Sequence, residues 1–367
     1  MKKIGIMTFH NTTNYGAILQ CYALQKYIND NLATCEVIDY NNDFLKKNYD
    51  INPLKASTIK DFVKKVLFFV PEYYNHKYFK QFTRDYIMVS STKYNENNIS
   101  TSNSEYSSFI VGSDQIWNYS LSGNDDNYLL NFCNDSSKKN SYAASFGSNK
   151  SYLDNKSKML DNLKSFNNIS VREDEIVDIL KDDLENKDVI QSIDPVFLLS
   201  KQDWENILIR NKTRKPYIFV YEVARTPLLR EFAKKLSEKY NLEIVYLSKS
   251  GKKMNNVKKL YSVSPIEFIN YIKNAEYVVT SSFHGLAFSL IFEKQFYFDT
   301  HEKNGEFSSR LSSLSRISKT ESRKINNVFE SNDFNMINYD NVNILLAKEI
   351  NKSYSYLSNV IKELDRK

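Results

Sequence analysis

Short β-rich segments alternate with amphipathic segments along nearly the whole chain of 367 residues. This alternation is typical of βα units, in which parallel strands form a sheet and helices cover its faces. In the first half, strands are expected at 4–9, 35–40, 109–112, 141–146, 169–171 and 189–193, and helices at 17–28, 59–69, 153–163 and 173–180. In the second half, strands are expected at 217–221, 243–247, 277–280 and 295–298, and helices at 228–239, 266–274 and 286–292. The sequence therefore predicts an α/β protein.

A charged segment that ends in proline, 210–217, separates the two runs of alternation and is predicted to be a linker. The chain is also too long for one typical core. We therefore predict a Rossmann-like domain at 1–209, a second at 210–333 and a return helix within 334–367. The two domains are expected to face a cleft. The last helix is long enough, at about 1.5 Å per residue, to cross back to the first domain.

The composition excludes several classes of protein. Lys and Arg are scattered, and they form no stripe of the kind that binds nucleic acid. Three cysteines without a CxxC pair argue against a disulfide framework and a zinc ribbon, and they favour a reducing compartment. The longest apolar run, 66–70, is too short to span a bilayer. We therefore expect a soluble, cytoplasmic protein with no nucleic-acid partner.

The formal net charge of +6 is small and has more than one interpretation. It fits an anionic substrate, or a loose peripheral association with an acidic membrane surface. The favoured interpretation is a solvated, Lys-rich surface.

The stretch VVTSSFHGLAFSLIFEKQF, 278–296, places two hydroxyls, a histidine and a glycine where a strand runs into a helix. A helix N-terminus attracts phosphate or carboxylate groups through its N–H groups and partial positive charge. Ser281 and Ser282 add hydroxyl donors, and Gly285 lets a ligand approach the backbone. His284 can move a proton near neutral pH. The alternative is structural: a serine caps the helix and the histidine fills a gap.

Cations elsewhere in the sequence could complete a site for an anion. Lys303 and Arg310 follow the next expected strand, and the alternative is that both are solvated charges. Arg172 ends a strand of the first half, and its planar guanidinium suits a carboxylate or phosphate. Glu173 and Asp174 follow directly, so a local ion pair is the competing interpretation.

The segment FIVGSDQIWN, 109–118, ends a strand with groups that suit a sugar. Ser113 and Gln115 can bond hydroxyls, and the ring of Trp117 offers a flat face. Asp114 could accept a proton from an attacking hydroxyl. The alternative is an N-cap aspartate beside a core tryptophan.

The segment TFHNTTNYGAILQ, 8–20, is the first strand–loop–helix unit, and its polar side chains suit a neutral polyol. Asn11, Asn14, Tyr15 and Gly16 are the candidate contacts. The segment lacks GxGxxG, so a dinucleotide fingerprint is absent. The sequence contains no P-loop, HExxH or GxSxG motif and no His/Asp/Glu cluster with metal-ligand spacing, so we expect no metal and no cofactor.

At these residues the chain resembles the polysaccharide pyruvyl transferase family. The shared segments, in the order found in that family, are GIMTFHNTTNYGAILQCYALQ, VGSDQIWN, SYAASFG, SVRE, DPVFLL and SSFHGLAFSLIFEKQF. The resemblance covers about 3–314. It implies a fold like that of GT-B glycosyltransferases and transfer of a pyruvyl group from phosphoenolpyruvate to a sugar, usually as a cyclic ketal.

The resemblance assigns Arg172, His284 and Lys303 to contacts with phosphoenolpyruvate, which serves as a co-substrate. One position departs from the family pattern. Many members carry an arginine where this chain has Ser282, and we expect Arg310 to supply that cation.

The residue types also fit this chemistry independently. Phosphoenolpyruvate carries a carboxylate and a phosphate, which require cations, and its methylene carbon needs an acid, for which His284 is the candidate. The expected product is a ketal on a sugar of a cell-surface polysaccharide or its precursor, and the acceptor can be free, lipid-linked or polymeric. Two alternatives stay open: a nucleotide-sugar glycosyltransferase of the same architecture, and a protein that binds a glycan or metabolite without turnover.

Overall fold

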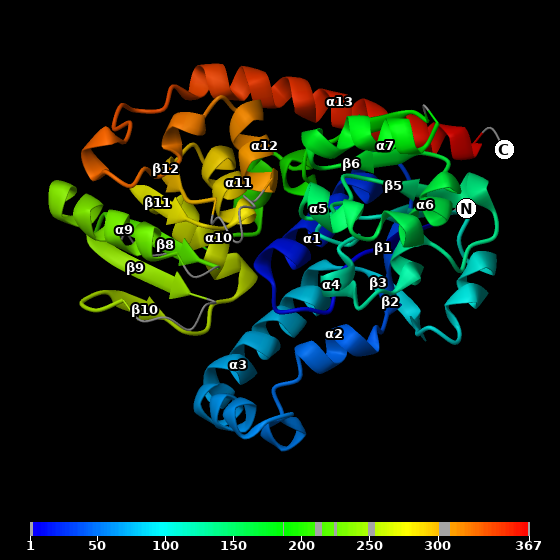
Figure 1. The fold of residues 1–367 in the computed structure, drawn as a ribbon, viewed down its shortest axis with the longest axis horizontal. Helices are drawn as coiled ribbons and strands as arrows, with labels where there is room; N and C mark the ends of the chain where they lie inside the picture. Colours follow the sequence, from blue (N-terminus) through cyan, green and yellow to red (C-terminus); the bar gives the residue numbers. More distant parts are fainter. Residues whose placement is uncertain are drawn as a thin grey trace. The chain divides into compact units, whose positions relative to one another are not determined.

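A computed structural model of the chain describes residues 3–185, 187–209, 215–223, 226–248, 254–300 and 309–365. The chain divides into two compact units, which we call unit 1 (1–198 and 349–367) and unit 2 (199–348). Each unit is built on a five-stranded parallel sheet (Figure 1). The predicted α/β class with two Rossmann-like units is confirmed. The boundary at Leu198/Leu199 lies before the expected linker at 210–217, of which residues 210–214 lie outside the described residues.

The sheet of unit 1 has the strand order β3-β2-β1-β4-β5. Its strands are β1 (Ile4–Met7), β2 (Cys35–Tyr40), β3 (Val89–Tyr94), β4 (Ser108–Val111) and β5 (Lys139–Ser141). Ile4 of β1 lies opposite Cys35 on one side and Ser108 on the other. The chain leaves β1 toward β2 on one side of the sheet, and it later returns to β4 on the other side of β1. The carboxyl ends of β1 and β4 therefore flank a topological switch point, which is where open α/β sheets bind ligands.

Helices and a small second sheet complete the core of unit 1. The helices are α1 (Tyr15–Asn31), α2 (Asp43–Asn48), α3 (Ile59–Tyr86), α4 (Tyr119–Ser122), α5 (Asn149–Leu153), α6 (Lys156–Lys164) and α7 (Val177–Asp183). The strands β6 (Ile169–Val171) and β7 (Val189–Gln191) pair in parallel. An isolated bridge between Ala144 and Val171 joins β6 to the chain that leaves β5.

The sheet of unit 2 has the equivalent order β10-β9-β8-β11-β12, again parallel throughout. Its strands are β8 (Tyr217–Glu222), β9 (Glu243–Ser248), β10 (Lys258–Leu260), β11 (Tyr277–Thr280) and β12 (Gln295–Phe298). Its helices are α8 (Lys201–Asn206), α9 (Pro227–Tyr240), α10 (Pro265–Lys273), α11 (Phe283–Ile291) and α12 (Ser309–Ile317). The switch point of this unit lies between β8 and β11.

The structure differs from the expected elements at several places, and it contains β10, α2, α8 and α12, which the sequence pattern did not predict. Helix α3 continues through Pro71 to Tyr86, although the sequence pattern predicts its end at 69. Strand β5 occupies Lys139–Ser141, so it shares only Ser141 with the expected strand at 141–146. Strand β3 was not expected because its sequence, VSSTKY, is mostly polar, and it lies at the edge of its sheet.

The last helix, α13 (Tyr339–Asp365), begins in unit 2 and ends in unit 1, as predicted for a return helix. Within unit 2, the hydroxyl of Tyr339 donates to the carbonyl oxygen of Lys294 and lies 3.3 Å from that of Ser289. Within unit 1, the hydroxyl of Tyr356 donates to the carbonyl oxygen of Ser141 at 2.8 Å. The helix therefore satisfies backbone groups of each unit separately.

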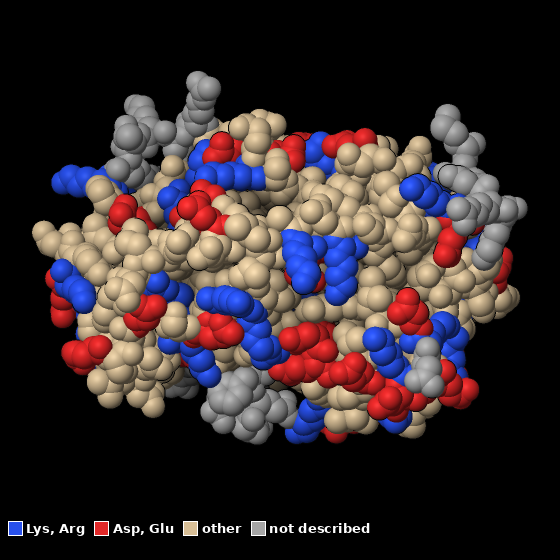
Figure 2. All heavy atoms as spheres, turned by 90° about the horizontal axis from the view of Figure 1, so that it is seen from above, with Lys and Arg blue, Asp and Glu red and all other residues tan. Residues whose placement is uncertain are grey.

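The face of the protein that Figure 2 shows carries no large field of a single sign. On the face shown in Figure 2, Lys and Arg are interspersed with Asp and Glu. The three cysteines, Cys21, Cys35 and Cys133, are free and buried. Among the described residues, no helix combines the length and the apolar character that a membrane span requires.

Ser353 of α13 provides a test of how much this helix stabilises unit 1. Its fully buried hydroxyl accepts a hydrogen bond from the backbone N–H of Ile193 at 3.1 Å. We expect Ser353→Ala to lower the free energy of unfolding by about 1–3 kcal/mol, because it leaves a buried N–H without its acceptor. Urea denaturation measures this loss. Ser355→Ala is the matched control, since that exposed hydroxyl bonds only within its own helix, and equal losses in the two variants contradict the interpretation.

Candidate functional site

The junction between β11 and α11 in unit 2 forms as the sequence predicts. Strand β11 ends at Thr280, and Ser282 is the N-cap of α11, its hydroxyl accepting from the N–H of Gly285 at 3.4 Å. His284 lies in the first turn of the helix, 6% exposed, with its ring edge-to-face against Phe283. A buried imidazole therefore stands at the positive end of a helix, at the carboxyl end of a central strand.

Hydroxyl groups fix this junction to the neighbouring strand β8. The hydroxyl of Ser281 accepts a hydrogen bond from the N–H of Val223 at 3.1 Å. The hydroxyl of Thr280 donates to the carbonyl oxygen of Tyr221 at 3.0 Å. Ser281 and Ser282 each use an oxygen lone pair to accept a backbone N–H, and a hydroxyl has one proton that it can donate. The predicted serines thus hold the switch point together, and donation to a ligand stays a prediction.

Gly285 has a different role from the predicted one. A Cβ at this position would overlap the side chain of Thr280. The glycine is buried, so it allows α11 to pack closely on β11. The approach of a ligand to the backbone at Gly285 stays a prediction.

A buried carboxylate lies beside the junction. Glu222, the last residue of β8, is fully buried and pairs with the guanidinium of Arg230 at 2.9 Å. The same carboxylate accepts from the hydroxyl of Tyr246 and from the N–H of Thr226. The charge of Glu222 is thus compensated within unit 2, which leaves the helix terminus as the feature that attracts an anion.

The cations predicted after β12 are placed only in part. Arg310 is half-buried in the first turn of α12, which packs against α11. Its element therefore lies beside the helix that carries His284. Lys303 lies outside the described residues.

In unit 1, Arg172 joins a buried charge cluster at the carboxyl ends of three strands. Its Nη1 donates to Oδ2 of Asp194 at 2.6 Å, and the two side chains are 3% and 0% exposed. Ser113 bonds both partners: its hydroxyl donates to Oδ2 of Asp194 at 3.2 Å and lies 3.4 Å from Nη1 of Arg172. The competing interpretation was an ion pair of Arg172 with Glu173 or Asp174. The ion pair described here is instead with Asp194. Glu173 instead accepts from the hydroxyl of Ser145.

Asp114 follows Ser113 in an unusual backbone conformation, with φ at 73°. Aspartate is one of the few residues that adopts this left-handed region readily. The carboxyl of Asp114 is buried. Burial of Tyr49, and to a smaller extent the charge of Asp114, raises the pKa of Tyr49 to about 12. Asp114 therefore lies near the Tyr49 hydroxyl, which also bonds Thr12.

Trp117 does not face solvent as a sugar platform requires, whereas Gln115 is partly exposed. The indole of Trp117 is 1% exposed and packs against Phe146 and Phe166. Its Nε1–H donates to the carbonyl oxygen of Tyr128 at 3.0 Å, so Trp117 is a core residue and the predicted stacking is wrong. The amide oxygen of Gln115 accepts from Asn118 at 3.1 Å.

The four predicted residues of the first loop divide into two groups. Asn11 and Asn14 are exposed, and Asn14 caps α1 by accepting from the N–H of Gly16 at 2.9 Å. Tyr15 and Gly16 are buried, and the Tyr15 ring packs against Phe79. Only the two asparagines can therefore reach a ligand in this structure.

A small hollow in unit 1 was missed by the sequence interpretation, although Asn11 lines it. It opens where β1 and β2 end, and its lining residues are Thr8, Phe9, His10, Asn11, Tyr40, Asn41, Asn42, Leu45, Lys46 and Tyr128. Nδ1 of His10 lies 3.3 Å from the carbonyl oxygen of Thr8, and Nε2 lies 3.2 Å from Oδ1 of Asp39. This hydrogen bond is the main reason that the pKa of Asp39 is lowered. The sequence signal was the histidine directly before Asn11.

In unit 1, as in unit 2, a hydroxyl forms a hydrogen bond between the two strands that flank the switch point. The hydroxyl of Thr8 donates to the carbonyl oxygen of Ser113 at 3.1 Å, which joins the ends of β1 and β4. Gln20 of α1 donates to the same Thr8 oxygen at 3.0 Å. Among the described residues, no group of His, Cys, Asp and Glu side chains could hold a metal ion.

Comparisons with known proteins identify one family. The family model described as polysaccharide pyruvyl transferase matches residues 14–298. No curated protein sequence matches the chain.

Solved structures with a similar fold were also found. A UDP-GlcNAc 2-epimerase from Neisseria meningitidis is 9% identical with a TM-score of 0.48, over 100% of this chain and 99% of that one. A UDP-GlcNAc 2-epimerase from Methanocaldococcus jannaschii is 12% identical with a TM-score of 0.47, over 100% of both chains. The ADP-heptose lipopolysaccharide heptosyltransferase II of E. coli is 11% identical with a TM-score of 0.37, over 95% of this chain and 99% of that one.

The buried pair of Arg172 and Asp194 makes a stability prediction. We expect Arg172→Ala to lower the free energy of unfolding by about 3–5 kcal/mol, because it leaves the Asp194 carboxylate buried without its counter-charge. The double variant Arg172→Ala, Asp194→Asn should recover part of this loss. Urea denaturation of both single variants and the double variant measures the coupling.

The exposed pair of Lys26 and Asp30 is the control, and Lys26→Ala should change stability little. If the losses of the two single variants simply add in the double variant, the pair does not stabilise unit 1 as a unit.

Proposed function

This chain belongs to the polysaccharide pyruvyl transferase family, and on that premise we propose that it moves the enolpyruvyl group of phosphoenolpyruvate onto a sugar and releases phosphate. The proposed acceptor is a sugar of a cell-surface polysaccharide or of its lipid-linked precursor. The proposed product is a pyruvate ketal across two hydroxyls.

One observation carries the proposal: His284 is buried in the first turn of α11, at the switch point of unit 2. The positive end of the helix favours a phosphate or carboxylate in this position. An imidazole can both give up and accept a proton, so a histidine in this position can deliver a proton and recover it. Phosphoenolpyruvate supplies the anion and the carbon that must be protonated.

The proposed reaction begins with transfer of a proton from His284 to the methylene carbon of phosphoenolpyruvate. The resulting cationic carbon, stabilised by its oxygen, is attacked by one sugar hydroxyl, which loses its proton. Phosphate then leaves, favoured by the helix terminus and by cations, for which Arg310, Lys303 and Arg172 are the candidates. A second hydroxyl of the same sugar attacks the same carbon, loses its proton and closes the ketal. The protons lost by the hydroxyls regenerate His284 and neutralise the phosphate.

Unit 1 provides the groups proposed for the acceptor. The hollow at the ends of β1 and β2 combines the amides of Asn11 and Asn41 with aromatic side chains, a mixture that suits sugar hydroxyls and a sugar ring. Asp114, buried near Tyr49, is the proposed base for an attacking hydroxyl. His10 is added to the acceptor candidates because it lines the hollow and is oriented by Asp39.

Product analysis tests the proposal directly. The purified chain is incubated with candidate sugar acceptors and either phosphoenolpyruvate or a nucleotide sugar. We expect phosphate release and a mass gain on the acceptor with phosphoenolpyruvate only. Nucleotide release in place of phosphate release supports the glycosyltransferase alternative, and release from neither donor supports a binding protein without turnover.

Replacement of His284 tests its assigned role. We expect His284→Gln to lower kcat about 100-fold or more, because glutamine can bond a ligand but cannot deliver a proton. Phosphate release measures kcat, and calorimetry checks that phosphoenolpyruvate still binds. His76→Gln, in α3, is the matched control and should retain activity. Near-normal turnover of the His284 variant removes the histidine from the mechanism.

A further inference from the structure

The first half of α3 exposes almost every apolar side chain that it carries. The exposed apolar residues of this half are Ile59, Phe62, Val63, Val66, Leu67, Phe68, Phe69, Val70, Tyr73 and Tyr74. Leu67 is 71% exposed and Val66 is 50% exposed. Folded proteins rarely leave a contiguous apolar patch of this kind in water unless it contacts a partner or a membrane.

These residues form one face of the helix. At 3.6 residues per turn, all of them except Phe68 fall within a sector about 160° wide. Lys60 and Lys64 border one edge of this sector, and Lys65 borders the other. The acidic residues Asp61 and Glu72 lie on the opposite side of the helix. The segment is therefore an amphipathic helix with its apolar face uncovered and lysines along both margins.

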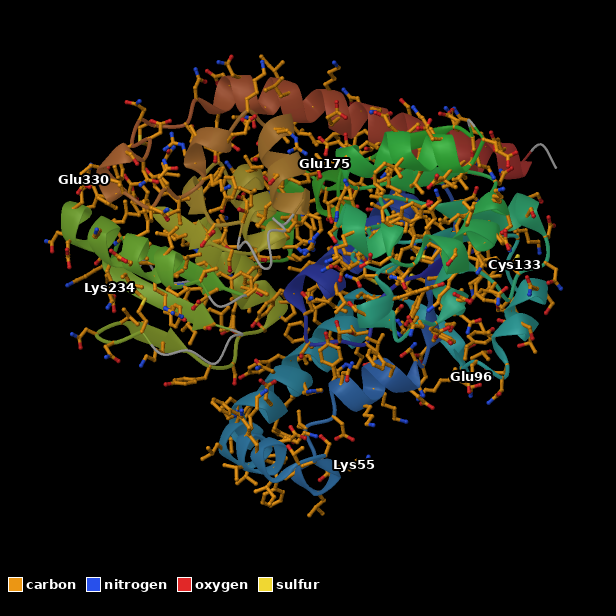
Figure 3. The ribbon with its side chains drawn as sticks, viewed as in Figure 1. Lys55, Glu96, Cys133, Glu175, Lys234 and Glu330 are labelled. Atoms are coloured by element: carbon orange, nitrogen blue, oxygen red, sulfur yellow. The ribbon has the colours of Figure 1, made fainter. Side chains whose placement is uncertain are left out.

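The second half of the same helix is fixed to the core of unit 1. Its buried residues are Asn75, Phe79 and Phe82. Phe79 packs against Tyr15, and Phe82 packs against Tyr22, both on α1. In Figure 1 the first half of α3 reaches away from the sheet of unit 1, and Figure 3 shows Lys55 at the tip of the same projection. The core thus holds the apolar face in place without covering it.

The charge of the projection selects its partner. Residues 43–70 contain six lysines and three aspartates, a net charge of +3. Asp50 is paired with Lys55, and Asp61 is paired with Lys65. The remaining lysines, including Lys60 and Lys64, favour an anionic partner. An apolar face with lysines at its margins is the pattern of helices that lie in the interface of an anionic lipid bilayer, where the lysine ammonium groups reach the headgroups.

We propose that the first half of α3 docks the protein on an anionic membrane surface, with its apolar face in the headgroup region. The helix is not apolar enough to cross the bilayer, in agreement with the absence of a spanning helix among the described residues. Docking of this kind would bring the protein to lipid-linked sugars. The inference goes beyond the proposed reaction and does not depend on it.

Vesicle flotation with the full-length chain, without donor or acceptor, tests the docking. The vesicles are phosphatidylcholine alone, or phosphatidylcholine with about one third phosphatidylglycerol. We expect association with the anionic vesicles and little with the neutral ones. Val66→Glu with Leu67→Glu should weaken the association at least tenfold, because two charges then enter the apolar face. Met336→Glu with Ile344→Glu, two side chains of unit 2 that are each 70% exposed, is the matched control and should leave it unchanged.

Lysine variants test the charge contribution separately. Lys60→Gln with Lys64→Gln should lower association with the anionic vesicles roughly tenfold. Added salt should also lower the association of the wild-type chain, because it screens the attraction between lysines and headgroups. Lys234→Gln with Lys348→Gln, two exposed lysines of unit 2, is the control. The proposal is overturned if the wild-type chain does not float with anionic vesicles, or if the Glu variants float equally well. It is also overturned if the apolar face proves to join two copies of the chain, seen as a dimer in light scattering that the Glu variants abolish. A negative result leaves phosphate release intact, so it is separable from failure of the proposed reaction.

Discussion

In each unit, a hydroxyl group bonds the backbone across the gap between the two strands that flank the switch point. Thr8 joins β1 to β4 in unit 1, and Ser281 joins β11 to β8 in unit 2. At a switch point the connections leave in opposite directions, so no helix covers the strand ends, and their backbone groups need side-chain partners. The residues that follow these bonds, Asn11, Asp114 and His284, therefore begin from fixed positions.

Buried charges behind these strand ends are compensated by nearby partners. Arg172 pairs with Asp194, and Glu222 pairs with Arg230. A buried charge is costly unless it is paired and hydrogen-bonded, so each pair constrains the orientation of both side chains. The guanidinium of Arg172 is therefore held in one orientation by Asp194 and Ser113.

The sequence predicted the elements whose local signals agree with their packing. The strands β2, β6, β11 and β12 lie at the expected residues, because each is a short β-rich run whose residues are mostly buried. Helix α3 extends beyond residue 69, where the sequence pattern predicted its end. Packing of Phe79 and Phe82 on α1 outweighs the tendency of Pro71 to break the helix. At the site, the position of His284 was predictable from the strand–helix junction. The roles of Gly285 and Trp117 were not, because a sequence does not show whether neighbouring side chains fill the space around a residue.

The course of α13 has a consequence for synthesis of the chain. Its last part belongs to unit 1, yet all of unit 2 is translated before it. The N–H of Ile193 and the carbonyl oxygen of Ser141 therefore find their partners only after the residues of unit 2 have been synthesised. The unit that is synthesised first is thus the one that completes its structure last, and premature termination affects both units.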